Sequence, residues 1–394
     1  MQHKESLSSF NLSILWFGAA ISLAEILTGA LIAPLGLFKG LLAIFIGHVV
    51  GCIIFVLAGH IGAKEQLPAI ETTRLSFGNW GAPFFAILNI IQLIGWTGVM
   101  IANGTAAIGS LTQFNPAVVS LFIAGLIALW IGIGFNKMKW LNLAAVVSLF
   151  FVSAVLGVIV FNSNEISSIV SSDLLSFGMA MELSIIMPLS WLPLISDYTM
   201  LSKSQKFGPT ASAIGYFFGS VFMYVIGLGA ALYAGTSDIA AILSTAGLPV
   251  VAVLIIILST LTTTFLDVYS AAVSFNVLKK VDPKVISMII CVLGAILAIK
   301  MPTSQYENFL YLIGSAFAPM FAILLTDYFL LRKGKSGNIN GYVNLGVWVI
   351  GVIIYRLMMR MDTPIGNSLP TMILVSGITW GIHYSKALLT QSHR

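Results

Sequence analysis

Charged residues are scarce in this sequence. They make up 8% of its 394 residues, whereas hydrophobic residues make up 58%. A soluble globular domain carries about 25% charged residues. With a mean hydropathy of +1.00, most of the surface of this chain must face something other than water, which excludes a soluble fold.

Cysteine and histidine, the residues of disulfide frameworks and of many metal sites, are also rare. Cys52 and Cys291 both lie inside apolar runs, where we interpret them as packing residues. The five histidines are scattered, and none recurs at metal-ligand spacing. The sequence therefore indicates no cofactor, and we predict that the chain is not an enzyme.

Long hydrophobic runs are abundant. A spanning helix needs about 20 apolar residues, and about twelve such runs occur. They are not the short alternating segments of a membrane β-barrel. We predict an all-α polytopic membrane protein with a single membrane domain over 1–394. The runs are 11–32, 37–60, 81–110, 117–135, 141–161, 176–199, 211–234, 248–276, 285–300, 306–331, 341–358 and 369–387.

The formal charge of +5 is distributed in a way that indicates a membrane topology and not a nucleic-acid partner. With both termini placed in the cytoplasm, all lysines and arginines fall on that side except Lys39, Lys300, Arg356 and Arg360. This bias is the positive-inside signature. The bilayer is the expected environment, and no obligate protein partner is indicated.

Two of the hydrophobic runs carry residues that interrupt helices. The first contains GAAISLAEILTG (18–29), with a glycine at each end, and the sixth contains MPLSWLPLISDY (187–198), with Pro188 and Pro193. Each proline removes a backbone donor and clashes with the preceding turn. A break at membrane depth must line a cavity or a protein interface.

The first and sixth runs are equivalent members of two sets of five. An odd number of helices per set inverts the second set, as in inverted-repeat transporters that bind substrate and ion at broken helices. We predict a first repeat over 11–161, a second over 176–332 and two further helices over 341–387. A channel, whose pore is built from rings of groups, does not need such paired breaks.

Acidic residues inside the runs are candidate functional groups, because a carboxylate at membrane depth is costly and usually faces a water-filled path or a partner. Glu25 lies at the suspected break of the first run, and Asp267 follows the polar stretch STLTTT in the eighth. Glu182 lies near the outer end of the sixth helix, close to the start of the run, where headgroup water is an alternative partner.

Two groups of polar residues recur at helical spacing. Ser259, Thr262 and Thr263 share one helix face, and their hydroxyls are of the oxygen type that sodium prefers. Alternatively, they bond back to helical carbonyls. Gln92 and Trp96, at i and i+4, place an amide and an indole on one face, which suits a flat heteroaromatic ligand; ordinary packing is the alternative.

Several stretches resemble the nucleobase:cation symporter-1 family. They are GHIGAK (59–64), RLSFG (74–78), QLIGW (92–96) and GSAFAPMFAILLTDYFLLR (314–332), and they extend over most of the chain. The short loops and the glutamate in the first run look most similar to the hydroxymethylpyrimidine transporter branch, related to cytosine permease. The resemblance implies twelve helices, a ten-helix core of the leucine-transporter type, alternating access and residence in the inner membrane.

The resemblance also implies residue roles. Trp96 would stack on the ring, and Ser190 and Trp191 would contribute at the break of the sixth helix. A sodium ion would be held by carbonyls near Gly18 and Ser22 together with the hydroxyls of Ser259, Thr262 and Thr263.

The expected substrate is a small pyrimidine. A carboxylate accepts hydrogen bonds from an exocyclic amine and, when protonated, also donates to a ring nitrogen. We therefore expect Glu25, with Asp267 nearby, to contact the edge of hydroxymethylpyrimidine, a thiamine precursor, which is imported with sodium. The alternative is a permease for cytosine or another nucleobase or hydantoin-like ring, with a proton as the coupling ion.

Overall fold

A computed structural model describes residues 6–109, 112–133, 135–162, 175–236, 249–300, 305–331 and 338–392. These residues form helices and short connections, with one isolated parallel bridge between Leu7 and Ser202. Nine helices of this part are long and apolar enough to cross a membrane, and a bent pair at the N-terminus adds a tenth. Two further long helices, α12 and α16, agree with the prediction of about twelve passes.

The helices follow the predicted runs, but several extend past them. Residues at a helix end continue the helix into the headgroup layer, where polar side chains are tolerated. In order they are α1 (Ser9–Ala20), α2 (Leu23–Leu31), η1 (Ala33–Leu35), α3 (Leu37–Glu65), α4 (Ala69–Thr72), α5 (Arg74–Gly109), α6 (Pro116–Ile133), α7 (Phe135–Asn162), α8 (Phe177–Ser190), α9 (Leu192–Thr199), α10 (Phe207–Ala234), α12 (Pro249–Leu278), α13 (Pro283–Lys300), α14 (Tyr306–Leu325), η3 (Thr326–Leu330), α15 (Asn338–Met358) and α16 (Ser368–Ser392).

The predicted break of the first helix is confirmed. The segments Ser9–Ala20 and Leu23–Leu35 meet at 57°. Ile21 (φ −75°, ψ 80°) and Ser22 (φ −141°, ψ 158°) have non-helical backbone angles. Of the last carbonyls of α1, those of Phe17 and Ala20 accept from the N–H groups of Ile21 (3.1 Å) and Ser22 (2.8 Å), so the carbonyls of Gly18 and Ala19 are the candidate ligands at this break.

The sixth helix is interrupted at Trp191, between α8 and α9, where the prediction placed a break; the interruption is one residue with near-helical angles (φ −90°, ψ −5°), and Phe177–Thr199 forms a single span. Pro193 lies at the start of α9, where its missing N–H has no helical partner to lose. Pro188 lies one turn earlier, and its carbonyl accepts the Trp191 N–H at 3.3 Å, which tightens the chain before it restarts.

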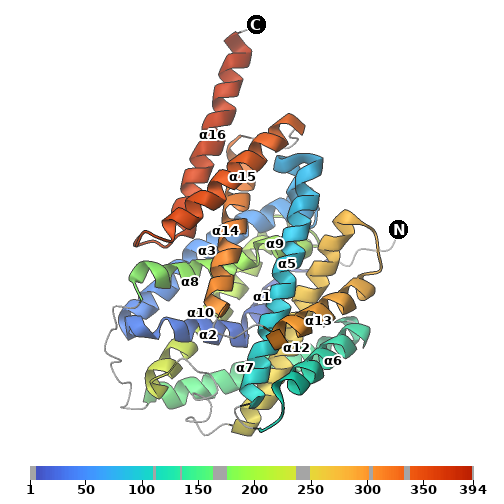
Figure 1. The fold of residues 1–394 in the computed structure, drawn as a ribbon, viewed down its shortest axis with the longest axis vertical. Helices are drawn as coiled ribbons and strands as arrows, with labels where there is room; N and C mark the ends of the chain where they lie inside the picture. The colour runs from blue at the N-terminus through green and yellow to red at the C-terminus, as the bar shows by residue number, and fades with distance from the viewer. Residues whose placement is uncertain are drawn as a thin grey trace.

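The two broken helices lie inside the bundle, surrounded by the long helices α3, α5, α10, α12 and α14 (Figure 1). Helix α10 packs along α1 and α2, and α12 packs along α5. Helices α15 and α16 pack against each other and α14 at one edge, with the C-terminal end of α16 projecting from it. The repeat boundaries 11–161 and 176–332 stay a prediction, and residue 332 lies outside the described residues.

The backbone of α10 lies directly against the backbone of the first helix. A Cβ on Gly215 would lie 2.1 Å from the carbonyl oxygen of Ser13, and one on Gly227 would lie 2.0 Å from that of Ile26. Small residues at helix interfaces allow such approach in membrane proteins. Helix α10 therefore lies close enough to contact the first helix on both sides of its break.

Candidate substrate and ion sites

Gln92 of α5 lies beside the break of the sixth helix. Its Nε2 donates to the carbonyl of Ser190 and to Oδ1 of Asn89, both at 3.2 Å. The Ser190 hydroxyl donates to the carbonyl of Met187 at 2.7 Å. Gln92 Oε1 and the neighbouring Trp191 Nε1 are buried and have no partner in the described part of the chain. A buried polar atom without a partner is costly, so these two atoms are suited to a ligand.

Two contacts set the antiparallel register of α5 and α12. Asn89 Nδ2 donates to Ser274 Oγ at 2.8 Å. Further along, a Cβ on Gly104 would lie 3.3 Å from Oγ1 of Thr260. The two helices therefore run antiparallel, so that residues from Asn89 to Gly104 on α5 lie opposite residues from Ser274 back to Thr260 on α12.

Trp96 and Asp267 lie at matching positions in this register. Trp96 is seven residues after Asn89, and Asp267 is seven residues before Ser274. Seven residues are nearly two helical turns, so Trp96 lies on the same face of α5 as Asn89, and Asp267 lies on the same face of α12 as Ser274. Asp267 is buried, at 3% exposed. The register therefore gives Asp267 on α12 and Trp96 on α5 matching positions along the two helices.

Aromatic rings surround the two predicted tryptophans. Trp96 packs edge to face against Tyr306 and Phe309 of the α14 region, with centroids at 6.1 and 5.4 Å. Trp191 packs in the same way against Trp16 of α1, at 5.6 Å. Trp16 is fully buried and was not predicted as part of the site. Its position within an apolar run was too ordinary to single it out.

Glu25 lies in the first turn of α2, next to the break, and its carboxyl group faces α10. Its Oε1 accepts from the Tyr216 hydroxyl at 2.8 Å, and its Oε2 accepts from the Ser220 hydroxyl at 2.7 Å. Both hydroxyls belong to α10. Each carboxyl oxygen thus has one partner on α10 and keeps further acceptor capacity, and the expected contact of Glu25 with the substrate edge stays a prediction.

His48 completes this cluster from α3. Its Nε2 lies 2.7 Å from Ser220 Oγ, and its Nδ1 lies 2.8 Å from the carbonyl oxygen of Ile44. Tyr216 and Ser220 were not predicted. They stand one helical turn apart, but hydroxyl residues at that spacing are common, and only the tertiary contact connects them to Glu25.

The hydroxyl face of α12 divides into two groups. Ser259, Thr260, Thr263 and Thr264 have buried hydroxyls with no partner among the described residues. Thr262 is only half-buried, and its hydroxyl donates to the Ser259 carbonyl at 3.0 Å. Of the three predicted ligands, Ser259 and Thr263 are thus suited to a hard cation, whereas Thr262 shows the alternative, back-bonded arrangement.

The residues predicted from the first helix lie at its break. Ser22 is buried in the extended segment between α1 and α2. Gly18 has no side chain, so only its carbonyl could serve as a ligand. A Cβ added there would meet Val146 of α7 at 3.4 Å. Helix α12 contacts both α1 and α2. No cluster of three or more His, Cys, Asp or Glu residues occurs in the described ranges.

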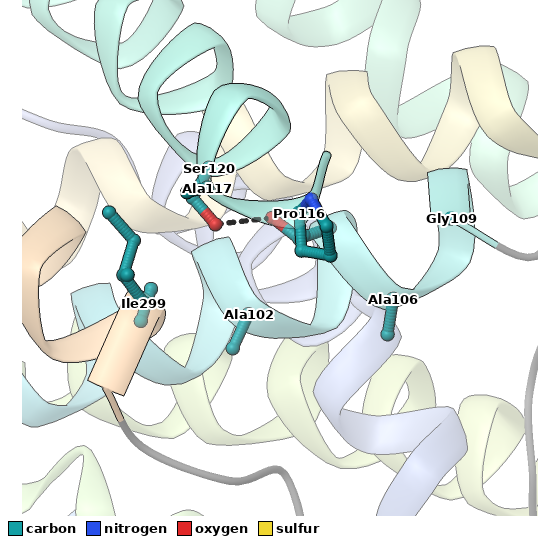
Figure 2. Close-up of a pocket in the computed structure, with 9 residues that line it drawn as sticks. Ala102, Ala106, Gly109, Pro116, Ala117, Ser120 and Ile299 are labelled. Carbon is teal, nitrogen blue, oxygen red and sulfur yellow. Dashed lines mark hydrogen bonds between the residues drawn. The ribbon is translucent and has the colours of Figure 1, made fainter. Parts of the chain in front are cut away.

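A cavity of about 490 Å³ lies apart from these groups, at the Gly109 end of α5 (Figure 2). Its lining comes from α5, α6 and α13 and is largely apolar. Its two hydroxyls, of Thr105 and Ser120, bond to each other at 2.9 Å. The cavity therefore offers little that would recognise a polar ring.

Comparison with known proteins agrees with this arrangement. Residues 1–344 match a family of permeases for cytosine/purines, uracil, thiamine and allantoin. The chain belongs to this family. It is also 23% identical to the cytosine permease of Escherichia coli strain K12 over 299 residues, which cover 74% of this chain and 70% of that permease.

Solved structures of transporters share the fold of this family member. Mhp1, a nucleobase-cation-symport-1 family transporter with bromovinylhydantoin bound, superposes with a TM-score of 0.77 at 18% identity, covering 95% of this chain and 91% of Mhp1. A Na⁺-coupled sialic acid symporter superposes with a TM-score of 0.73 at 14% identity, covering 96% and 90%. The chain is thus a multi-pass transporter with the leucine-transporter-like arrangement.

Proposed function

We propose that this transporter imports hydroxymethylpyrimidine into the cell by sodium symport, through alternating access. Both termini would lie in the cytoplasm, and the bilayer would be the inner membrane. The second candidate is a permease for cytosine or another nucleobase or hydantoin-like ring. It is favoured by the likeness to cytosine permease and to a transporter that binds a hydantoin.

The observation that carries the proposal is the group of unpartnered polar atoms beside two tryptophans. Gln92 Oε1 can accept from a ring N–H, and Trp191 Nε1 can donate to a ring nitrogen or carbonyl. Trp96 offers a ring face for stacking. Asp267, at the matching position on α12, can accept from an exocyclic amine, the contact that the sequence also predicts for Glu25. The Ser190 carbonyl orients Gln92.

Sodium would bind between the break of the first helix and α12. Carbonyls near Gly18 and Ser22 and the hydroxyls of Ser259 and Thr263 provide oxygen ligands of the kind hard cations prefer. For sodium to drive uptake, it must bind the outward-facing, substrate-ready state more tightly than the other state. The first helix also contacts the substrate site, because Trp16 of α1 packs against Trp191, so ion binding there can favour the arrangement that receives the ring.

Uptake into proteoliposomes tests the proposal. Radiolabelled hydroxymethylpyrimidine is supplied with and without an inward sodium gradient, and with excess unlabelled cytosine. Sodium-stimulated uptake that resists cytosine is the expected result. Uptake driven only by a proton gradient would remove sodium from the proposal. Transport of cytosine alone would establish the second candidate.

Removing single hydroxyls from α12 should separate the sodium ligands from their neighbour. Thr263→Ala and Ser259→Ala should each raise the sodium concentration for half-maximal uptake about tenfold, because a bond to a charged group contributes about 1.5–3 kcal/mol. Folding should be unaffected, since neither hydroxyl has a partner to lose. Thr262→Ala is the matched control and should leave sodium activation unchanged. Equal effects of all three changes would contradict this placement.

Truncating the stacking indole should weaken substrate binding. Stacking of a base on an aromatic side chain contributes about 1–3 kcal/mol, so Trp96→Ala should raise the substrate dissociation constant about tenfold to a hundredfold. The measurement is scintillation proximity binding of labelled hydroxymethylpyrimidine. Trp80→Ala, on the same helix but 68% exposed, is the control. Equal affinity in the Trp96 and Trp80 variants would place the ring elsewhere.

A further inference from the structure

A continuous row of hydrogen bonds runs across three helices, from α3 through α10 to α2. It joins the Ile44 carbonyl to His48 Nδ1 (2.8 Å), His48 Nε2 to Ser220 Oγ (2.7 Å), Ser220 Oγ to Glu25 Oε2 (2.7 Å) and Glu25 Oε1 to the Tyr216 hydroxyl (2.8 Å). The side chains of His48, Ser220, Glu25 and Tyr216 are all at most 1% exposed. The proposed transport function assigns no role to this row.

Counting protons along the row shows that it needs one more than its groups carry in their ordinary states at neutral pH. A backbone carbonyl only accepts, so His48 Nδ1 must carry a hydrogen. Ser220 has a single hydroxyl hydrogen and two close neighbours, Glu25 Oε2 and His48 Nε2. With Glu25 ionised and His48 neutral, that hydrogen can satisfy only one of them. The other contact would then bring two lone pairs together at 2.7 Å.

One added proton resolves this conflict in either of two arrangements. With Glu25 protonated, its O–H donates to Ser220 Oγ, and Ser220 donates to Nε2 of a neutral His48. With His48 protonated, Nε2–H donates to Ser220, and Ser220 donates to the Glu25 carboxylate. The two differ only by a shift of two hydrogens along the row. Burial away from water favours the uncharged arrangement.

The surroundings offer no other cation to Glu25. No lysine or arginine forms an ion pair with it within the described residues. The titratable groups that face it from the helices around it are those of α3, α10 and the start of α14, and none of them is a lysine, an arginine or a second carboxyl group. These groups are His48 and Cys52, Tyr216 and Tyr224, and Tyr306.

We propose that Glu25, Ser220 and His48 form a proton-binding site that holds one proton in this conformation, separate from the hydroxyls of α12. Loss of this proton breaks either the Glu25–Ser220 or the His48–Ser220 contact. The first of these fastens the broken first helix to α10, and the second fastens α10 to α3. The proton therefore stabilises this packing of the three helices, and its release favours their rearrangement.

Infrared difference spectroscopy of the protein in lipid nanodiscs tests the site without any substrate. Glu25→Gln is the informative variant, because the amide N–H that it introduces can donate to Ser220, and Ser220 can donate to His48. It thus copies the protonated row without a titratable group. At neutral pH, the wild type should show the carbonyl band of a protonated carboxylic acid, or the ring band of an imidazolium, and Glu25→Gln should lose it.

A different change in the spectra would overturn the proposal. If Glu25→Gln removes only the bands of an ionised carboxylate, and neither protein shows an imidazolium, the row holds no added proton and the proposal is overturned. Glu307→Gln, a half-buried glutamate with one hydroxyl donor, is the matched control and should leave the acid band in place. If Glu25→Gln does not fold, His48→Leu serves instead, and the acid band should shift because Ser220 loses its acceptor.

Because the spectra need no substrate, the proton site can fail while the proposed transport stands, and the reverse also holds. Measuring proton movement during uptake tests whether release of this proton is coupled to transport. In proteoliposomes that contain a pH-sensitive dye, uptake of hydroxymethylpyrimidine or cytosine should carry protons in the wild type and in Glu307→Gln, but not in Glu25→Gln. Uptake without proton movement in the wild type would show that the proton stays bound through the cycle and would overturn its release.

Discussion

Glu182→Ala is expected to lower the free energy of unfolding by about 3–5 kcal/mol, since it strips several buried donors of their acceptor. Glu182 is fully buried at the α8 side of the sixth helix. Its Oε2 accepts from the backbone N–H groups of Asn367 (2.6 Å) and Ser368 (2.7 Å). Its Oε1 accepts from the hydroxyls of Tyr355 and Ser368, both at 2.6 Å.

These four bonds make Glu182 the connection between the bundle core and the last two helices. Two of them cap the N-terminus of α16, where a negative charge also interacts favourably with the helix dipole. Tyr355 belongs to α15. In the variant, two backbone N–H groups are buried without an acceptor, and each such loss costs about 1–3 kcal/mol.

The measurement is the thermal unfolding midpoint of the purified protein in detergent. Glu307→Ala is the matched control, because Glu307 is only partly buried and accepts a single bond from Tyr311 at 2.9 Å. A large drop for Glu182→Ala and a small one for Glu307→Ala is expected. Similar midpoints for the two variants would mean that headgroup water, the alternative considered for Glu182, replaces the lost acceptor.

Gly227→Val should have the second large effect, on the order of 3 kcal/mol, through overpacking. The added Cβ would lie 2.0 Å from the carbonyl oxygen of Ile26 and 3.0 Å from the amide nitrogen of Ala30. Both are backbone atoms of α2, so no side chain can rotate out of the way. Helix α10 must move away from α2, which also pulls Tyr216 and Ser220 from Glu25.

Two readouts distinguish this from a generic effect of valine in a helix. The unfolding midpoint should fall, and uptake in proteoliposomes should be lost even in protein that remains folded. Gly125→Val is the control, since no atom lies within 4 Å of a Cβ added there and the residue is exposed on α6. Full uptake by Gly227→Val would show that α2 and α10 can separate without consequence.

Much of the fold could be predicted from residue types and their order. Long apolar runs separated by short polar connections predict spanning helices, because only a helix satisfies its own backbone inside lipid. Pro188 and Pro193 predicted the interruption at Trp191, since proline lacks the donor a continuous helix requires. The break near Ser22 followed from the glycines around it. The ends of the helices were predicted less accurately, because the hydropathy of the sequence drops before the helix ends.

The candidate site was predictable where its chemistry depends on neighbours along one helix. Gln92 and Trp96 share a face because of the helical period, and their spacing alone suggested a ring-binding pair. The same period placed Ser259, Thr262 and Thr263 on one face. It could not show that Thr262 turns to the Ser259 carbonyl while the other two hydroxyls stay unpartnered, because that depends on which part of the face is covered.

Glu25 shows the limit most clearly. The sequence by itself determined that this chain spans a membrane, that its first and sixth helices break, and that a carboxyl lies at the first break. These are properties of local composition and backbone chemistry. Only the tertiary structure decided that the carboxyl turns to Tyr216 and Ser220, 191 and 195 residues away. A side chain on a helix can face any neighbouring helix. The packing of α10 against the first helix and of α12 against α5 selects which neighbour it faces.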